Sequence, residues 1–156
     1  MPIFMKYGKI NGEAKAAGHE GWIELESAQL GTSRNATATG SVSRESRAPT
    51  LNEIVVTKKH DSSSTHLARE ALHGEGVEVI IDFMPNKARK PGEPPRAYLS
   101  MKLSDCMISS YSISGHGGTG GGPMESISLN CTSITHTTNR EFDLIEFLRA
   151  FGLPIP

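Results

Sequence analysis

The feature that most constrains the fold of this chain is the alternation of apolar and polar residues in several short segments. Residues 77–83 (VEVIIDF) place an apolar side chain at every odd position, and in GHEGWIELESAQL Ile23 and Leu25 alternate with glutamates. A two-residue period is typical of β-strands with one buried face. The segments IFMKY, NEIVVTKK, AYLSMKL, SDCMISSYSIS and MESISLNCTSI also favour strands. We therefore predict a mainly β protein, a barrel or sandwich of about seven to nine strands.

Two segments have the three- to four-residue period of amphipathic helices. The first, at about 62–73, follows Asp61 and a run of serines suited to an N-cap, and it ends before Gly74. The second, at about 139–151, opens with capping-box spacing in TNRE, and apolar residues recur through it at helical spacing. We expect one helix inserted between strands and one C-terminal helix.

The composition narrows the class of partner. The chain has 156 residues, a net charge of −1 and no apolar run long enough to span a membrane. This balance gives no general attraction to nucleic acid or to an anionic membrane, so we expect neither as a partner. The start, MPIFMKYGK, lacks the apolar core of a signal peptide, so we expect a cytoplasmic protein or one exported without a cleaved signal.

No motif in the sequence indicates catalysis, a cofactor or a metal. The glycine-rich run SGHGGTGGGP at 114–123 has no Walker lysine, and a strand rather than a helix follows it, so a hairpin loop is the better interpretation. His66, Glu70 and His73 share one helical face, but their spacing is not HExxH, and a solvated face is favoured over a metal site. No serine stands in GxSxG, so we predict no catalytic residues.

The two cysteines are too few for a disulfide framework. If Ser114 opposes Met124 in the last hairpin, residue 106 lies opposite residue 132, one position from Cys131, and a bulge could shift this register. Buried free thiols are the favoured state of Cys106 and Cys131 in a reducing cytosol.

The order of several segments resembles one known family. KYGKINGE, GHEGWIEL, EIVVTKKHDSSSTHL, LSDCMISSYSIS and MESISLNCTSI follow one another as in the Hcp proteins, the tube proteins of the bacterial type VI secretion system, from about Pro2 to Thr135. The most specific pieces are Gly21–Glu24 (GWIE), Val56–Asp61 (VTKKHD) and Ile108–Tyr111 (ISSY).

The resemblance implies a two-sheet β-barrel flanked by one helix, and a hexameric ring of such barrels. Rings of this family stack into a hollow tube that a contractile sheath expels beneath a spike, with effectors carried in the lumen. The protein would then move from the bacterial cytoplasm to the exterior. A secreted effector or adaptor on the same barrel is the alternative, and a ligand-binding barrel unrelated to secretion is a third. We divide the chain into an Hcp-like barrel domain, residues 1–137, and a C-terminal helical extension, residues 138–156.

The resemblance also points to contact residues. The loop from Gly31 to Thr50 matches the family's extended loop, which reaches the neighbouring ring, and a solvated loop is the simpler alternative. A cargo-binding position of the lumen aligns near Ser27 or Gln29. The chain departs from the family in its long glycine hairpin and its C-terminal helix, which packs on its own barrel or docks on a partner. The charged residues available for ring stacking are Arg34, Arg44, Glu45 and Arg47.

Overall fold

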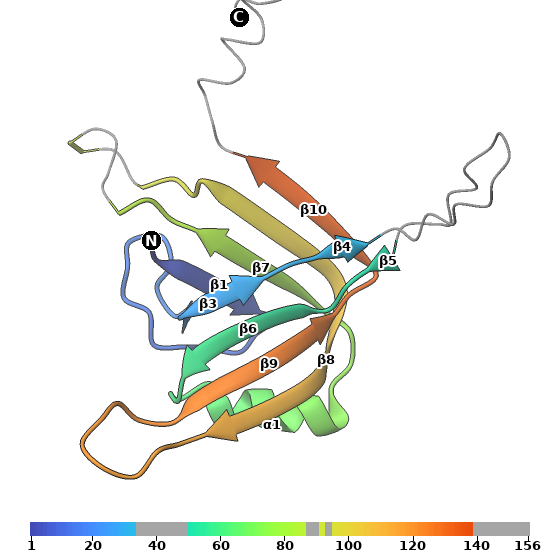
Figure 1. Cartoon of the computed structure of the whole chain (residues 1–156). Helices are drawn as coiled ribbons and strands as arrows, with labels where there is room; N and C mark the ends of the chain where they lie inside the picture. Colours follow the sequence, from blue (N-terminus) through green and yellow to red (C-terminus); the bar gives the residue numbers. More distant parts are fainter. Residues whose placement is uncertain (34–49, 87–90, 93–94, 139–156) are drawn as a thin grey trace, which may run out of the picture.

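The structure, a computed structural model, describes residues 1–33, 50–86, 91–92 and 95–138, and this part of the chain forms ten strands and one helix (Figure 1). The mainly β class is confirmed. The strand number exceeds the expected seven to nine because the segment 23–29 divides in two, the predicted strand that starts at Met124 divides into β9 and β10, and the two-residue strands β4 and β5 pair as a separate ribbon. The elements are β1 Ile3–Tyr7, β2 Ile23–Leu25, β3 Ser27–Gln29, β4 Thr32–Ser33, β5 Thr50–Leu51, β6 Ile54–Lys59, α1 Ser64–His73, β7 Val77–Phe83, β8 Leu99–Ser114, β9 Met124–Asn130 and β10 Ser133–Thr138.

The strands form an antiparallel barrel. The hydrogen-bonded order is β2-β1-β7-β8-β9-β6-β3, with β10 beside β8. The two ends of this path, β2 and β3, are separated in the chain only by Glu26, whose backbone N–H donates to the Thr57 carbonyl. The path thus returns on itself and its two end strands are not left as open edges, whereas β10 pairs with β8 alone.

Strand β8 joins the two sheets of the barrel. Its first half pairs with β7 and β10, and its second half pairs with β9. The sequence predicted two strands here, and this was wrong: the chain continues through Asp105, which adopts a φ of 51°, and bends without ending. A residue in this left-handed conformation introduces a local kink, and such kinks are how barrels turn their corners.

Helix α1 lies against β8 at one end of the barrel (Figure 1). It begins at Ser64, two residues later than expected. Ser63 is the N-cap residue, and its side chain makes no capping hydrogen bond. Leu67 is fully buried, and its side chain packs the helix against the main core. Gly74 ends the helix in an extended conformation rather than a left-handed one. Within the described residues, no helix is long and apolar enough to cross a membrane.

The core follows the two-residue period expected from the sequence. Ile23, Val79 and Ile81 are fully buried, as are Ile127 and Leu129 of the last hairpin. A smaller apolar cluster covers the opposite face of β1, where Phe4 packs with Trp22 and three further residues. The main core consists of Ile3, Met5, Tyr7, Ile23, Leu25, Ile54, Val56, Leu67, Val79, Ile81, Met101, Leu103, Cys106, Ile108, Ile127 and Leu129.

Candidate functional site

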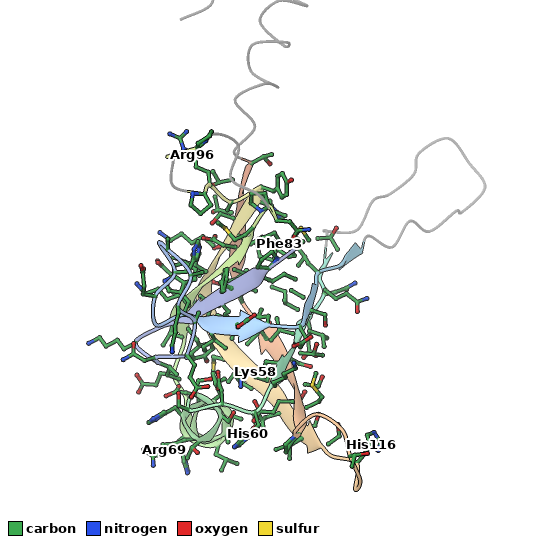
Figure 2. The ribbon with its side chains drawn as sticks, turned by 90° about the vertical axis from the view of Figure 1, so that its left-hand side faces the viewer. Lys58, His60, Arg69, Phe83, Arg96 and His116 are labelled. Carbon is green, nitrogen blue, oxygen red and sulfur yellow. The ribbon has the colours of Figure 1, made fainter. Side chains whose placement is uncertain are left out.

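A buried ion pair joins β6 and β9 beneath the start of α1. Lys58 and Glu125 are partners in the register of the two strands. Both side chains are fully buried, and Lys58 Nζ lies 2.7 Å from Glu125 Oε2. The same ammonium donates to Asp61 Oδ1 at 2.9 Å and to Ser64 Oγ at 3.0 Å. Figure 2 shows Lys58 inside the ribbon and His60 below it, towards α1. We call this group, completed by Tyr111 and His60, the Lys58 cluster.

The second oxygen of Glu125 is also satisfied. Oε1 accepts a hydrogen bond from the Tyr111 hydroxyl and lies 3.0 Å from His60 Nδ1. Burial acts to raise the pKa of Glu125, but hydrogen bonds from Lys58, Tyr111, Ser64 and His60 outweigh it and hold the pKa below the ordinary 4.5. Burial, together with the bond to Glu125 and its negative charge, raises the pKa of Tyr111 well above 10. The Glu125 carboxyl is therefore ionised and the Tyr111 phenol is neutral at physiological pH.

The Lys58 cluster also fixes the first turn of the helix. Asp61 Oδ1 accepts from the backbone N–H of Ser63 at 2.9 Å and from its hydroxyl, while the Asp61 N–H donates to Ser64 Oγ at 2.9 Å. These bonds satisfy groups that a helix start would otherwise leave unpaired. Every charged atom of Lys58 and Glu125 has a partner, and the cluster joins β6, β8, β9 and α1.

A second polar group joins the segment 8–22 to β7 and β8. His19 is buried, stacks on Phe4 at a centroid distance of 4.9 Å and meets Trp22 edge-on at 4.5 Å. Its Nε2 lies 2.8 Å from Asp82 Oδ2, while Ser100 donates to the other oxygen of Asp82. In a hydrolytic triad the serine bonds to histidine. Here both bond to the aspartate, so this group anchors a loop and lacks the geometry of a triad.

Both polar groups coincide with the segments that carry the family resemblance. Lys58, His60 and Asp61 belong to VTKKHD, Tyr111 ends ISSY, and Trp22 belongs to GWIE. The sequence interpretation missed the ion pair itself. A usable signal was present: Lys58 is in phase with the buried residues of β6, and Glu125 is in phase with those of β9. Two opposite charges at inward positions of paired strands indicate a buried salt bridge.

The predicted cargo residues lie on the face of the sheet that points away from the core. Ser27 and Gln29 are exposed on β3, and Ser27 Oγ is hydrogen-bonded to Thr57 Oγ1 at 2.5 Å. Through the cross-strand pairing, Ser27 and Gln29 each begin a row of paired residues that crosses β3, β6, β9 and β8, which lie side by side (Figure 1). We call this surface the hydroxyl face. Its rows are Ser27, Thr57, Ser126 and Ser112, and Gln29, Val55, Ser128 and Ser110.

The glycine run and the helical histidines show no site. Residues 115–123 connect β8 to β9, which confirms the hairpin interpretation, and Figure 2 shows His116 on this loop. A Cβ added at Gly117, Gly120 or Gly121 would meet nothing within 4 Å, so no backbone cradle forms there. Among the described residues, no group of three or more His, Cys, Asp or Glu side chains is arranged to hold a metal.

Other predicted features lie outside the described residues. They are the ring-stacking candidates Arg34, Arg44, Glu45 and Arg47 and the C-terminal helix at about 139–151.

The fold and its polar groups define a class of protein: a closed antiparallel β-barrel with one inserted helix, in which buried polar clusters stabilise the barrel. The family model described as "Type VI secretion system effector, Hcp" matches residues 4–137. This match covers most of the chain, and the protein therefore belongs to the Hcp family of the type VI secretion system. No curated protein matches the chain significantly.

Solved structures agree with this assignment. A structure described as a type six secretion system protein is 25% identical, with a TM-score of 0.78 over 86% of this chain and 82% of the other. Hcp1 from Salmonella typhimurium is 20% identical, with a TM-score of 0.65 over 88% and 86%. A type VI secretion system effector from Yersinia pestis is 21% identical, with a TM-score of 0.68 over 89% and 91%. The last two similarities concern the fold alone.

Proposed function

We propose that this protein is the structural subunit of a type VI secretion inner tube. Six copies close into a ring, rings stack into a hollow tube, and the tube leaves the cytoplasm through the apparatus. The observation that carries this proposal is the family match over residues 4–137, which spans nearly the whole barrel. Each contact within a ring joins two different surfaces of neighbouring barrels. Such heterologous contacts form a closed ring when the rotation from one subunit to the next is a whole fraction of 360°. The role requires no catalysis, and the chain acts without a cofactor.

The hydroxyl face is the surface that we assign to the lumen wall. Seven of its eight residues are uncharged and polar, and Val55 is the exception. Short neutral side chains offer many weak hydrogen bonds and no strong charge preference, which suits cargo proteins of different sequence. We therefore retain Ser27 and Gln29 as cargo-contact residues. Substituting Ser27→Asp should reduce binding of an acidic effector while rings persist, and unchanged binding would argue against this assignment.

Ring stacking is assigned to the loop between β4 and β5. The charges of Arg34, Arg44, Glu45 and Arg47 provide ion pairs that are individually weak and sensitive to salt, which suits a reversible ring contact. Deletion of residues 34–46 should leave rings intact and abolish tubes. Tubes that persist after the deletion would assign this loop to solvent instead.

Residues 138–156 distinguish the tube subunit from the alternative, an effector or adaptor built on the same barrel. The word "effector" in the family description favours considering that alternative. Truncation after Thr138 decides the role of this extension: a lowered melting temperature indicates packing on the barrel, whereas lost secretion at unchanged stability indicates docking on the spike, the sheath or cargo.

The decisive experiment is light scattering on the full chain after size-exclusion chromatography, followed by electron microscopy. A particle of six chains and annular images support the tube subunit. A stable monomer across the accessible concentration range would refute it and favour the effector or adaptor.

A further inference from the structure

The two cysteines stand opposite one another where β8 bends. On one side of the bend Met107 pairs with Asn130, and on the other side Ser104 pairs with Ser133. Two residues intervene on each strand, so Cys106 faces Cys131. The sequence-based register placed residue 106 opposite residue 132. The register differs by one position because a bulge lies between Ile108 and Ser110.

The surroundings of the two side chains agree with this register. Cys106 is fully buried in the main core, and Cys131 is half-buried and packs against the same core. The Thr132 N–H donates to the Ser104 carbonyl at 3.1 Å, so the two strands stay in hydrogen-bonded contact across the bend. Facing residues in antiparallel strands have Cα atoms about 4.5–5.5 Å apart. A disulfide requires about 4.4–6.8 Å, so the backbone can accept one. Both thiols are free in this structure, but only Cys106 is buried as the sequence predicted.

We propose that Cys106 and Cys131 form an intramolecular disulfide when the protein meets a small-molecule disulfide oxidant, and that this bond clamps the bend of β8. In the first step a Cys131 thiolate attacks one sulfur of the oxidant, and one thiol leaves. In the second step the Cys106 thiolate attacks the Cys131 sulfur of the mixed disulfide, and the second thiol leaves. The two released thiols carry the two protons and the two electrons lost by the cysteines. The proposal rests on the barrel register and is independent of tube assembly.

Burial sets the order and the pace of these steps. Burial, followed by the charges of Cys131 and Asp105, raises the pKa of the Cys106 thiol to about 12. Burial also raises the pKa of the Cys131 thiol. Thiolates are the reactive species, so both cysteines react slowly at neutral pH, and the half-exposed Cys131 reacts first. The protein thus remains reduced in a reducing compartment and oxidises only on prolonged exposure to an oxidising one.

Oxidised glutathione added to the reduced full chain tests the proposal. We expect both thiols to disappear and the single tryptic peptide 103–140, which holds both cysteines, to become lighter by two hydrogen atoms. Further cleavage at Glu125 should leave two fragments joined until a reductant separates them. The melting temperature of the oxidised chain should rise by on the order of 10 °C, because the bond closes the loop from 106 to 131.

Cys131→Ser is the matched control, because this half-buried position accepts a hydroxyl group more readily than the buried Cys106. In that variant the oxidant should change neither the melting temperature nor the Cys106 thiol. Cys106→Ala should stop at a mixed disulfide on Cys131. The proposal is overturned if the wild-type chain retains both thiols, stops at the mixed disulfide, or forms only bonds between chains.

Discussion

Removal of the Lys58 charge should be among the most damaging single changes in the barrel. Lys58→Met keeps the length and much of the apolar surface of the side chain but removes the ammonium that contacts Glu125 at 2.7 Å. Glu125 then stays fully buried without its counter-charge, and Tyr111, Ser64 and His60 are its remaining hydrogen-bond partners. An unpaired buried charge has a large desolvation cost, which is the reason for the expected loss.

The expected loss is about 3–5 kcal/mol, the range found when one member of a buried ion pair is removed. The free energy of unfolding of a domain of this size is about 5–15 kcal/mol, and each kcal/mol lost lowers the melting temperature by about 2–4 °C. Urea denaturation followed by Trp22 fluorescence measures the loss directly, because the chain has one tryptophan. Lys59→Met is the control: the Lys59 side chain is 69% exposed and its Nζ lies 3.5 Å from Glu26 Oε1, so its loss should lower the free energy of unfolding by under about 1 kcal/mol.

A second substitution tests the physical reason for the destabilisation by Lys58→Met as well as its size. Glu125→Gln should destabilise the wild-type chain, because the Lys58 ammonium loses its counter-charge. The same change should stabilise the Lys58→Met chain, because it removes the unpaired carboxylate while keeping an acceptor oxygen for Tyr111. The reasoning is refuted if Glu125→Gln has the same sign in both backgrounds, or if Lys58→Met costs no more than the Lys59 control.

Three further predictions follow from the described residues. The pKa of Glu125 in the folded chain lies below the ordinary 4.5, so its stabilising contribution is complete above about pH 4.5 and is lost as the pH falls through the folded value. Glu125→Gln should therefore reduce the loss of stability that the wild-type chain shows as the pH is lowered. Gly12→Ala would place a Cβ 2.4 Å from the Trp22 carbonyl oxygen and should cost about 1–3 kcal/mol in urea denaturation, whereas Gly120→Ala, with nothing within 4 Å, should be neutral. An Asn-Gly turn in place of residues 115–123 should preserve the circular dichroism spectrum and change stability by about 1 kcal/mol or less, and loss of the fold would contradict the strand pairing.

Local pattern was enough to predict much of the barrel. The period of two in residues 77–83 and 124–130 identified the strands and the residues that face the core, because successive side chains of a strand alternate between faces. The family resemblance added the closure of the strands into a barrel. The predicted break within residues 99–114 was wrong, because only pairing with β7, β9 and β10 carries β8 through the left-handed Asp105.

The chemistry of individual side chains required the tertiary structure. Ser27 and Gln29 were predicted as separate contact residues, and pairing between strands extended them into the hydroxyl face. Cys106 and Cys131 were placed one position out of register, because a bulge depends on the partner strand and leaves no mark in local alternation.

The sequence by itself determined which segments are strands, which residues face inward and which family the chain resembles, since these follow from periodicity and from the order of short motifs. Only the tertiary structure decided that Lys58 and Glu125, distant in the chain, share a buried bond, and that His19 and Ser100 bond to Asp82 rather than to each other. The physical reason is that hydrogen bonds and ion pairs act over a few ångströms, and the separations that matter at that range are fixed only when the strands pair.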